Sequence, residues 1–403
     1  MDSPILSQPI KFVPEYRAII MKRLLFIFTF FCLLAIHGGA QNILTLENCL
    51  RIGIENNLSL QGKRKAMQKS KYGISENRVK LLPQINGFAN FNDNIDPPVS
   101  VTDGSSYGVP YNITRTLQYS ANAGIELQMP LYNQTLYTSI SIAEIVDEMS
   151  RLSYEKARED LILQISKMYY LGQVTSEQIA LIKANITRLE ELRDITQAFF
   201  DNGMAMEVDL KRVNINLENL KVQYDNAQAM MTQQLNMLKY IMDYPAEKEI
   251  GLLPVNTDSI ATVALTGLSE NLYELQLLQS QVQLAERQKR LVSNGYIPIF
   301  NGLDKKYKIR KAMIDIETMK LSRLDTRKNL QTQYLNAVND LMNNQRNFKK
   351  QKDNYLLAEE VYTVTTDRYR EGITSMTEVL QDEMRMSEAQ NNYISAHYNY
   401  RVT

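Results

Sequence analysis

Two long stretches of the chain repeat apolar residues at helical spacing and contain no proline. They run from Pro130 to Pro245 and from Pro298 to the end of the sequence, and both are rich in Leu, Ile, Met, Gln, Glu, Lys, Arg and Asn. In the first stretch, apolar residues advance by threes and fours: Ile179, Ile182, Ile186, Leu189, Leu192, Ile195 and Phe199. Since no proline breaks them, these stretches predict very long helices whose apolar face packs against neighbouring helices.

A glycine interrupts each stretch at a comparable place. The segment Phe199–Gly203 reads FFDNG, and the segment Asp367–Gly372 reads DRYREG. Aromatic and polar residues followed by glycine are typical of a helix C-terminus that leads into a tight reversal. We therefore expect two antiparallel helical hairpins that reverse at Gly203 and Gly372. The first arm, residues 134–202, would be on the order of 100 Å long.

The two predicted hairpins repeat each other in sequence. Pro130–Asn133 (PLYN) matches Pro298–Asn301 (PIFN), 168 positions further on, and Gly203 matches Gly372, 169 positions further on. Two offsets that agree within one residue indicate an internal duplication.

The region between Pro83 and Pro130 has a period of two instead. From Tyr119 to Met129, apolar and polar residues alternate strictly, as in a strand with one apolar and one polar face. We expect the segment 85–92 to be its partner strand, with a long loop marked by prolines and glycines between them. Strands of this length suggest a lipid-facing barrel wall, and the alternative is a soluble hairpin packed on helices. The predicted lipid-facing residues are Tyr119, Ala121, Ala123, Ile125, Leu127 and Met129.

Residues 21–40 have a positively charged start, a short apolar core and small residues before Gln41. These are the features of a secretory signal peptide, so we expect an exported protein whose working start is Met21. Beyond Gln41 no stretch approaches the roughly 18–20 apolar residues that a spanning helix needs.

Composition excludes several function classes. The chain has 403 residues with 45 basic and 45 acidic side chains, so it lacks the basic field that drives nucleic-acid binding. Cys32 and His37 lie in the leader, which leaves Cys49 and His397 as the single mature Cys and His. Neither a zinc cluster nor a Cys/His or Ser/His nucleophile pair can be assembled from them. We expect no catalytic, cofactor or metal site, and we expect Cys49 to be a small core side chain.

Several motifs together resemble the TolC-type outer-membrane efflux (channel-tunnel) family. They are the LTLENCL segment 44–50 with Glu55-Asn56-Asn57, the Leu82-Pro83-Gln84 entry to the first strand, the Pro-aromatic-Asn entries at Pro130 and Pro298, and the two glycine reversals. The resemblance implies a homotrimer with a periplasmic α-barrel of long helical hairpins and one β-barrel in the cell outer membrane. It also implies a passive exit duct, not an enzyme, that works with a periplasmic adaptor protein and an inner-membrane pump.

In this family, acidic side chains at the helix reversals narrow the tunnel mouth. The family motif acid-Val-Leu-acid begins six residues after the second glycine, where this chain has Glu378, and Gln381 replaces the second acid, with Asp382 just beyond. Asp209 lies six residues after Gly203. The resemblance thus makes Glu378, Asp209 and Asp382 candidate mouth residues, and the alternative is that they are solvated acids in the first turns of returning helices.

The predicted fold is mainly α with a small β part. It divides into a start extension and signal peptide (1–40), first-repeat helices (41–80), a β-hairpin of the membrane barrel (81–130), the first long helical hairpin (131–245), a linker or equatorial segment (246–270), a second-repeat helix (271–297) and the second long helical hairpin (298–403).

The second repeat lacks a counterpart to the β-hairpin. Tyr296 resembles the family's approach to a third strand, yet Ile297-Pro298 already resembles the entry into the long helix. The returning helix is also shorter, because 31 residues follow Gly372 whereas 42 separate Gly203 from Pro245. Two strands per chain give six in a trimer, and even about eight leave an interior filled by side chains. We expect either a degenerate copy that conducts poorly or a barrel built in another way. The competing function is a periplasmic structural coiled-coil protein without a pore.

Overall fold

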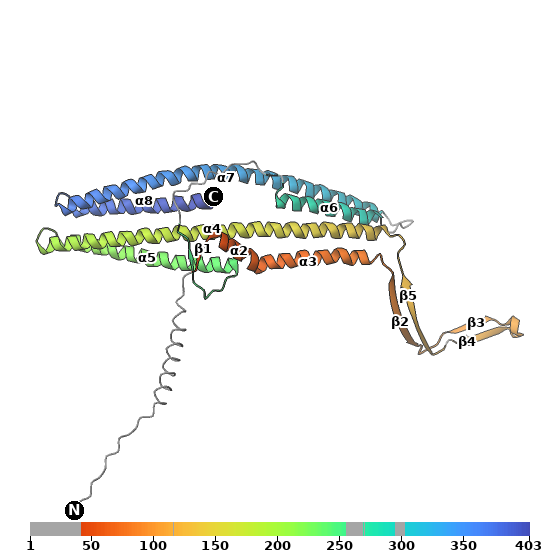
Figure 1. The fold of residues 1–403 in the computed structure, drawn as a ribbon. Coiled ribbons are helices and arrows are strands. Elements are labelled where there is room, and N and C mark those ends of the chain that lie inside the picture. Colours follow the sequence, from red (N-terminus) through yellow and green to blue (C-terminus); the bar gives the residue numbers. More distant parts are fainter. Residues whose placement is uncertain (1–41, 116, 255–268, 270, 295–302) are drawn as a thin grey trace, which may run out of the picture.

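The computed structural model describes residues 42–115, 117–254, 269, 271–294 and 303–403 (Figure 1). The predicted leader and the motif at Pro298 lie outside these residues. Within these ranges, no helix is both long enough and apolar enough to cross a lipid bilayer.

Four helices form the two predicted hairpins. The first hairpin pairs α4 (Gln134–Asp201) with α5 (Glu207–Met242), and the second pairs α7 (Asp304–Arg370) with α8 (Met376–Val402). Asn133 begins α4, because its side-chain oxygen accepts hydrogen bonds from the Thr135 and Leu136 amides at 2.9 and 3.3 Å. The predicted long helices, and with them the mainly α fold, are confirmed.

The same hydrogen-bonded turn ends both long helices. Gly203 and Gly372 have φ angles of +73° and +74°, a region that glycine enters without steric cost. In the first turn the Met204 amide donates to the Phe199 carbonyl at 2.8 Å, and in the second the Ile373 amide donates to the Arg368 carbonyl at 2.9 Å. Both are Schellman motifs, in which the left-handed glycine satisfies the last carbonyls of the helix.

Shorter helices complete a layer along α4 and α7 (Figure 1). They are α2 (Leu46–Asn56), α3 (Leu58–Val79) and α6 (Tyr273–Asn294). In one half of the molecule α5 and α8 lie beside the long helices, and in the other half α3 and α6 do so. Helix α4 contacts α3, α5, α6 and α8, whereas α7 contacts α6 and α8. The layer therefore has two edges, formed by α3 and α5 on one side and by α7 on the other.

A strand ribbon leaves the layer at the end where α3 stops and α4 starts (Figure 1). Strands β2 (Gln84–Asp93) and β5 (Tyr119–Gln128) pair antiparallel over ten residues each, as predicted. The predicted long loop between them is wrong in part, because it contains a second antiparallel pair, β3 (Val99–Asp103) and β4 (Tyr111–Arg115), with a short 3₁₀ helix at Ser105–Tyr107.

A third strand pair, which is parallel, lies in the middle of the molecule and was not predicted. It joins β1 (Asn42–Leu44) to β6 (Ile250–Leu252). These strands fall in segments that the sequence assigned to first-repeat helices and to the linker. Three-residue strands are too short for alternation to reveal them, so only the tertiary pairing identifies them.

The core consists of two main clusters. The predicted apolar seam of α4 is confirmed, since Ile182, Leu189 and Leu192 are buried against residues of α5, α7 and α8. The second cluster surrounds Cys49, which is fully buried and free, as expected for a core side chain. Burial raises the pKa of the Cys49 thiol to about 11, so this cysteine is unreactive in the folded chain.

Candidate functional site

The two helix reversals lie next to each other at one end of the molecule (Figure 1). The rings of Phe199 and Tyr369, at the ends of α4 and α7, have centroids 5.5 Å apart. The Arg370 guanidinium lies 3.7 Å from the Glu191 carboxylate. These contacts hold the two hairpin tips together, so the predicted mouth residues fall in one region.

Glu378 is the third residue of α8. Its backbone amide donates to the Oγ of Ser375, the capping residue, at 3.4 Å, which fixes the first turn of the helix. The Glu378 side chain is exposed, and its carboxylate has no ion-pair partner among the described residues. The positive end of the helix dipole favours this negative charge.

Asp209 occupies the corresponding third position of α5, but its carboxylate is engaged. It lies 3.3 Å from the Arg212 guanidinium, and its side chain is only 13% exposed. Asp382 is engaged in the same way, since it accepts a hydrogen bond from Thr365 at 2.8 Å and pairs with Arg385 at 3.0 Å. Of the three candidate mouth residues, Glu378 is therefore the one that presents a free carboxylate to solvent.

The strand ribbon has one apolar and one polar face. On the apolar face, directly opposed pairs include Ile85–Leu127 and Phe91–Ala121. Of the predicted lipid-facing residues, Tyr119, Ala121, Ala123, Ile125 and Leu127 lie on this face, whereas Met129 follows the end of β5. The large apolar side chains on this face are exposed in the single chain, up to 81% for Ile125.

Phe88 is a large apolar residue on the otherwise polar face of the ribbon. It opposes Gly124, where an added Cβ atom would lie 2.8 Å from the Phe88 ring. The ring therefore covers the glycine and fills the gap that its missing side chain leaves.

A buried polar network links α4 to α8 and was missed by sequence reasoning. The Tyr393 hydroxyl donates to the Glu177 carboxylate at 2.6 Å, and His397 Nδ1 lies 2.7 Å from its other oxygen. Arg401 Nε donates to His397 Nε2 at 3.3 Å, so Nδ1 carries the proton and donates to Glu177. His397 is fully buried. Glu177 and His397 are 220 positions apart, so no local pattern could reveal the pair.

Burial opposes ionisation of Glu177, but the hydrogen bonds from His397 and Tyr393 outweigh it and hold the pKa of Glu177 below its ordinary value. Burial, reinforced by the neighbouring carboxylate, raises the pKa of Tyr393. The network is structural: the Tyr393 hydroxyl and His397 Nδ1–H both donate to the Glu177 carboxylate. Within the described part of the chain, no group of three or more His, Cys, Asp or Glu side chains could hold a metal ion.

Both edges of the helical layer carry exposed apolar residues at coiled-coil spacing. On α5 they recur every seven or eight positions and are 44–60% exposed: Val208, Ile215, Val222, Met230 and Met237. On α7 they fall at multiples of seven and are 47–63% exposed: Ile314, Leu321, Leu335, Met342 and Leu356. Such stripes are the seams by which helices pair.

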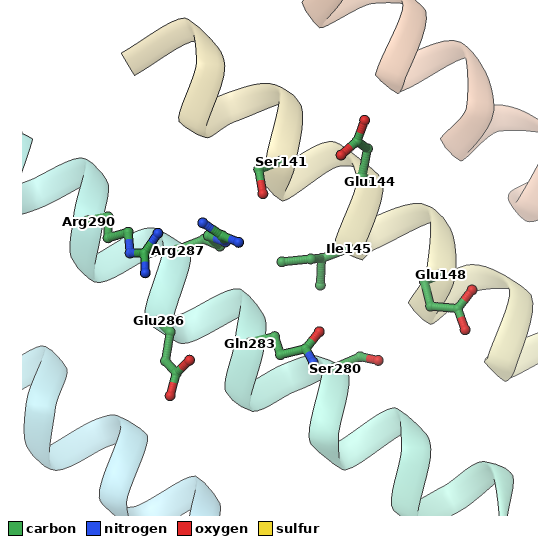
Figure 2. Close-up of a pocket in the computed structure, with 9 residues that line it drawn as sticks. All are labelled: Ser141, Glu144, Ile145, Glu148, Ser280, Gln283, Glu286, Arg287 and Arg290. Carbon is green, nitrogen blue, oxygen red and sulfur yellow. The ribbon is translucent and has the colours of Figure 1, made fainter. Parts of the chain in front are cut away.

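A groove of about 460 Å³ lies between α4 and α6, near the end that carries the ribbon. Figure 2 shows Arg287 extending from α6 toward α4, with Arg290 on the same helix, while Glu286 points away from α4. The lining is polar and charged on both sides, so the groove is suited to a charged group more than to an apolar one.

Comparisons with known proteins agree with this architecture. A family model described as outer membrane efflux protein matches residues 51–242. The probable efflux pump outer membrane protein TtgC of Pseudomonas putida is 26% identical over 180 residues, which cover 41% of this chain and 36% of TtgC. The outer membrane protein TolC of Vibrio cholerae is 22% identical over 272 residues, 64% of this chain and 56% of TolC. The match thus spans less than two thirds of either relative.

Solved structures extend the similarity to most of the chain. The outer-membrane channel OprN superposes with a TM-score of 0.74 at 12% identity over 89% of this chain and 87% of its own. CusC gives 0.75 at 14% identity, covering 89% of both chains. The MtrE outer membrane channel of Neisseria gonorrhoeae gives 0.73 at 16% identity, over 89% of this chain and 86% of MtrE. At these identities the likeness establishes the fold.

Proposed function

Because this chain belongs to the TolC-type outer-membrane efflux protein family, we propose that three copies form a passive exit duct. The helical layers enclose water in the periplasm, and the ribbons enter the outer membrane. The duct carries solutes delivered by an inner-membrane pump through a periplasmic adaptor, and the pump supplies the energy.

The observation that carries this proposal is the pair of exposed apolar edges. A single layer leaves the stripes on α5 and α7 in water, which is unfavourable for apolar surface of this extent. When the α7 edge of one copy meets the α5 edge of the next, both stripes are buried in a coiled-coil seam. The contact is heterologous, so it closes into a ring when the rotation between copies is suitable.

The ribbon supports the membrane part of the proposal. Its apolar face suits lipid and its polar face suits water or neighbouring polar side chains. Only residues 295–303 separate α6 from α7, and nine residues cannot contain two further ten-residue strands. Each copy thus contributes a single ribbon, and three copies contribute six long strands, too few for a wide lumen.

Glu378 gives the mouth its proposed electrostatic character. A threefold ring places three free carboxylates around the axis at the hairpin tips. Such a ring attracts cations and is opened by mutual repulsion unless salt screens it. Asp209 and Asp382 contribute less, because each is already paired with an arginine.

The test combines fractionation with measurement of the oligomeric state. We expect the protein in the outer-membrane fraction and as a trimer in mild detergent by light scattering. The double variant Ile215→Lys/Val222→Lys should be monomeric, because it places charges in the α5 stripe. The control Gln223→Lys adds a charge to an exposed position beside the stripe and should remain trimeric.

Two results would contradict the proposal. If the protein is a monomer that stays soluble without detergent, it cannot form the wall of a duct. Recovery in the washed periplasmic fraction would favour the alternative, a structural coiled-coil protein without a pore. Planar-bilayer recording tests the pore itself. We expect a small conductance from the trimer, because six long strands leave a narrow lumen, and large, stable conductance would refute the strand count while leaving the trimer intact.

A further inference from the structure

Charge is distributed unevenly between the two ends of the helical layer. The end where the ribbon leaves comprises residues 73–80, 134–143, 286–294 and 304–311, and we call it the basic end. It contains ten basic and three acidic residues. The hairpin tips, residues 194–214 and 363–383, contain four basic and nine acidic residues. The balanced total of 45 basic and 45 acidic residues hides this asymmetry.

Most cations of the basic end are not neutralised within the chain. Three of them are ion-paired, namely Arg78 with Glu144, Lys80 with Glu76 and Lys308 with Asp304. The other seven have no ion-pair partner among the described residues: Arg287, Lys289, Arg290, Lys305, Lys306, Arg310 and Lys311. Like charges gathered at the ends of adjacent helices repel one another, so an external anionic surface would stabilise this end.

The groove between α4 and α6 shows how the cations are left free. Each carboxylate that lines it is engaged elsewhere. Glu144 pairs with Arg78 at 2.8 Å, Glu148 with Arg151 at 2.6 Å and Glu286 with Lys320 at 3.4 Å. Arg287 and Arg290 line the same groove of about 460 Å³, and neither has an ion-pair partner among the described residues (Figure 2). Planar guanidinium groups bind phosphate through paired N–H donors.

We infer that the basic end binds the anionic phospholipid headgroups of the leaflet that faces the helices, with a lipid phosphate held between Arg287 and Arg290. This inference rests on the proposed function, because the ribbon that enters the membrane begins at this end. Exposed tyrosines lie at the same level, including Tyr132, Tyr137 and Tyr307. Amphipathic rings of this kind favour the membrane–water interface. The position of the basic end beside the ribbon, its positive charge and its exposed tyrosines therefore all favour an anionic lipid surface as the ligand.

The test is vesicle flotation with the full-length, detergent-purified protein. Vesicles contain either phosphatidylcholine alone or a mixture of phosphatidylcholine and phosphatidylglycerol. Each cation near an anionic surface strengthens binding roughly fivefold at low salt. We therefore expect at least about tenfold stronger binding to the anionic vesicles, and high salt should remove this preference.

Matched variants locate the effect on the molecule. The first neutralises four cations of the basic end by Lys305→Gln, Lys306→Gln, Arg310→Gln and Lys311→Gln. The second, Arg287→Gln/Arg290→Gln, removes the groove cations. Both should lose most of the preference for phosphatidylglycerol. The control neutralises four exposed cations elsewhere on α7 that lie outside the apolar stripe, by Arg323→Gln, Arg327→Gln, Arg346→Gln and Lys350→Gln, and should keep it.

The outcomes separate this inference from the proposed function. If the wild-type trimer binds both vesicle types equally, the lipid inference is overturned and the duct is unaffected. If the control loses the preference as fully as the first variant does, overall charge explains the binding and the inference also fails. If the wild type binds neither vesicle type and remains monomeric, both proposals fail together.

Discussion

The buried network around Glu177 gives the sharpest prediction for stability. Replacement by alanine removes the acceptor of both the Tyr393 hydroxyl and the His397 Nδ1–H. Both donors would then remain in the packed space between α4 and α8, where His397 is fully buried.

The loss of stability expected for Glu177→Ala follows from the kind of interaction that the substitution removes. Each hydrogen bond to a charged group contributes about 1.5–3 kcal/mol, so the loss of the two that Glu177 accepts costs about 3–6 kcal/mol. Unfolding entropy of about 2 cal/mol/K per residue gives roughly 0.8 kcal/mol/K for a chain of this length. The expected decrease in Tm for Glu177→Ala is therefore about 4–7 °C.

Thermal unfolding of the detergent-solubilised protein, followed by circular dichroism at helical wavelengths, measures this decrease. The matched control is Glu159→Ala, which removes an exposed glutamate from the same helix. It should change the Tm by less than about 1 °C. A Glu177→Ala variant that melts within a degree of the wild type would refute the reasoning.

The same carboxylate predicts a pH dependence. The pKa of Glu177 in the folded chain lies below its ordinary value of 4.5, so its ionised form stabilises the fold. This contribution is complete above pH 4.5 and is lost as the pH falls through the lowered pKa of the folded state. The Tm difference between wild type and Glu177→Ala should therefore narrow only below about pH 4.5.

Three further predictions follow from single positions. Gly53→Ala should destabilise by about 1–3 kcal/mol, because the new Cβ overlaps Ile165 in the core, and Ile165→Val in the same chain should restore part of the melting temperature. Gly372→Ala should cost about 1–2 kcal/mol through backbone strain at φ +74° alone, since nothing lies within 4 Å of its Cβ position. Glu378→Gln should weaken block of any residual conductance by divalent cations, whereas Glu360→Gln on α7 should not.

Local chemistry explains why the helices were predictable. Helix α4 starts directly after Asn133 and ends before Gly203, because a cap and a left-handed turn each depend on a few neighbouring residues. The strand Tyr119–Gln128 was predictable for the same reason, since alternation is a local pattern. The candidate acid Glu378 came from the resemblance to the family, whose mouth motif begins six residues after the glycine.

The structural features that could not be predicted from the sequence depend on contacts between distant segments. The parallel pair β1–β6 joins Asn42–Leu44 to Ile250–Leu252, and neither segment is long enough to show a period. The engagement of Asp382 by Thr365 depends on how α7 and α8 are aligned, which spacing does not specify. The family resemblance therefore proposed three mouth acids, and the contacts of Asp209 with Arg212 and of Asp382 with Thr365 and Arg385 leave Glu378 as the free one.

The duplication was preserved unevenly, and the structure provides a physical reason. Helix α4 has 68 residues and α7 has 67, although the ribbon that precedes α4 has no counterpart of its length before α7. Helices α4 and α7 both contribute buried residues to the core that they share with α5 and α8, so shortening α4 or α7 would expose apolar side chains of its neighbours. The ribbon contributes nothing to that core, because its apolar side chains are exposed in the single chain. A chain with one ribbon instead of two therefore keeps its helical layer intact. The assembly of the helical layers into a ring does not depend on how many strands line the pore.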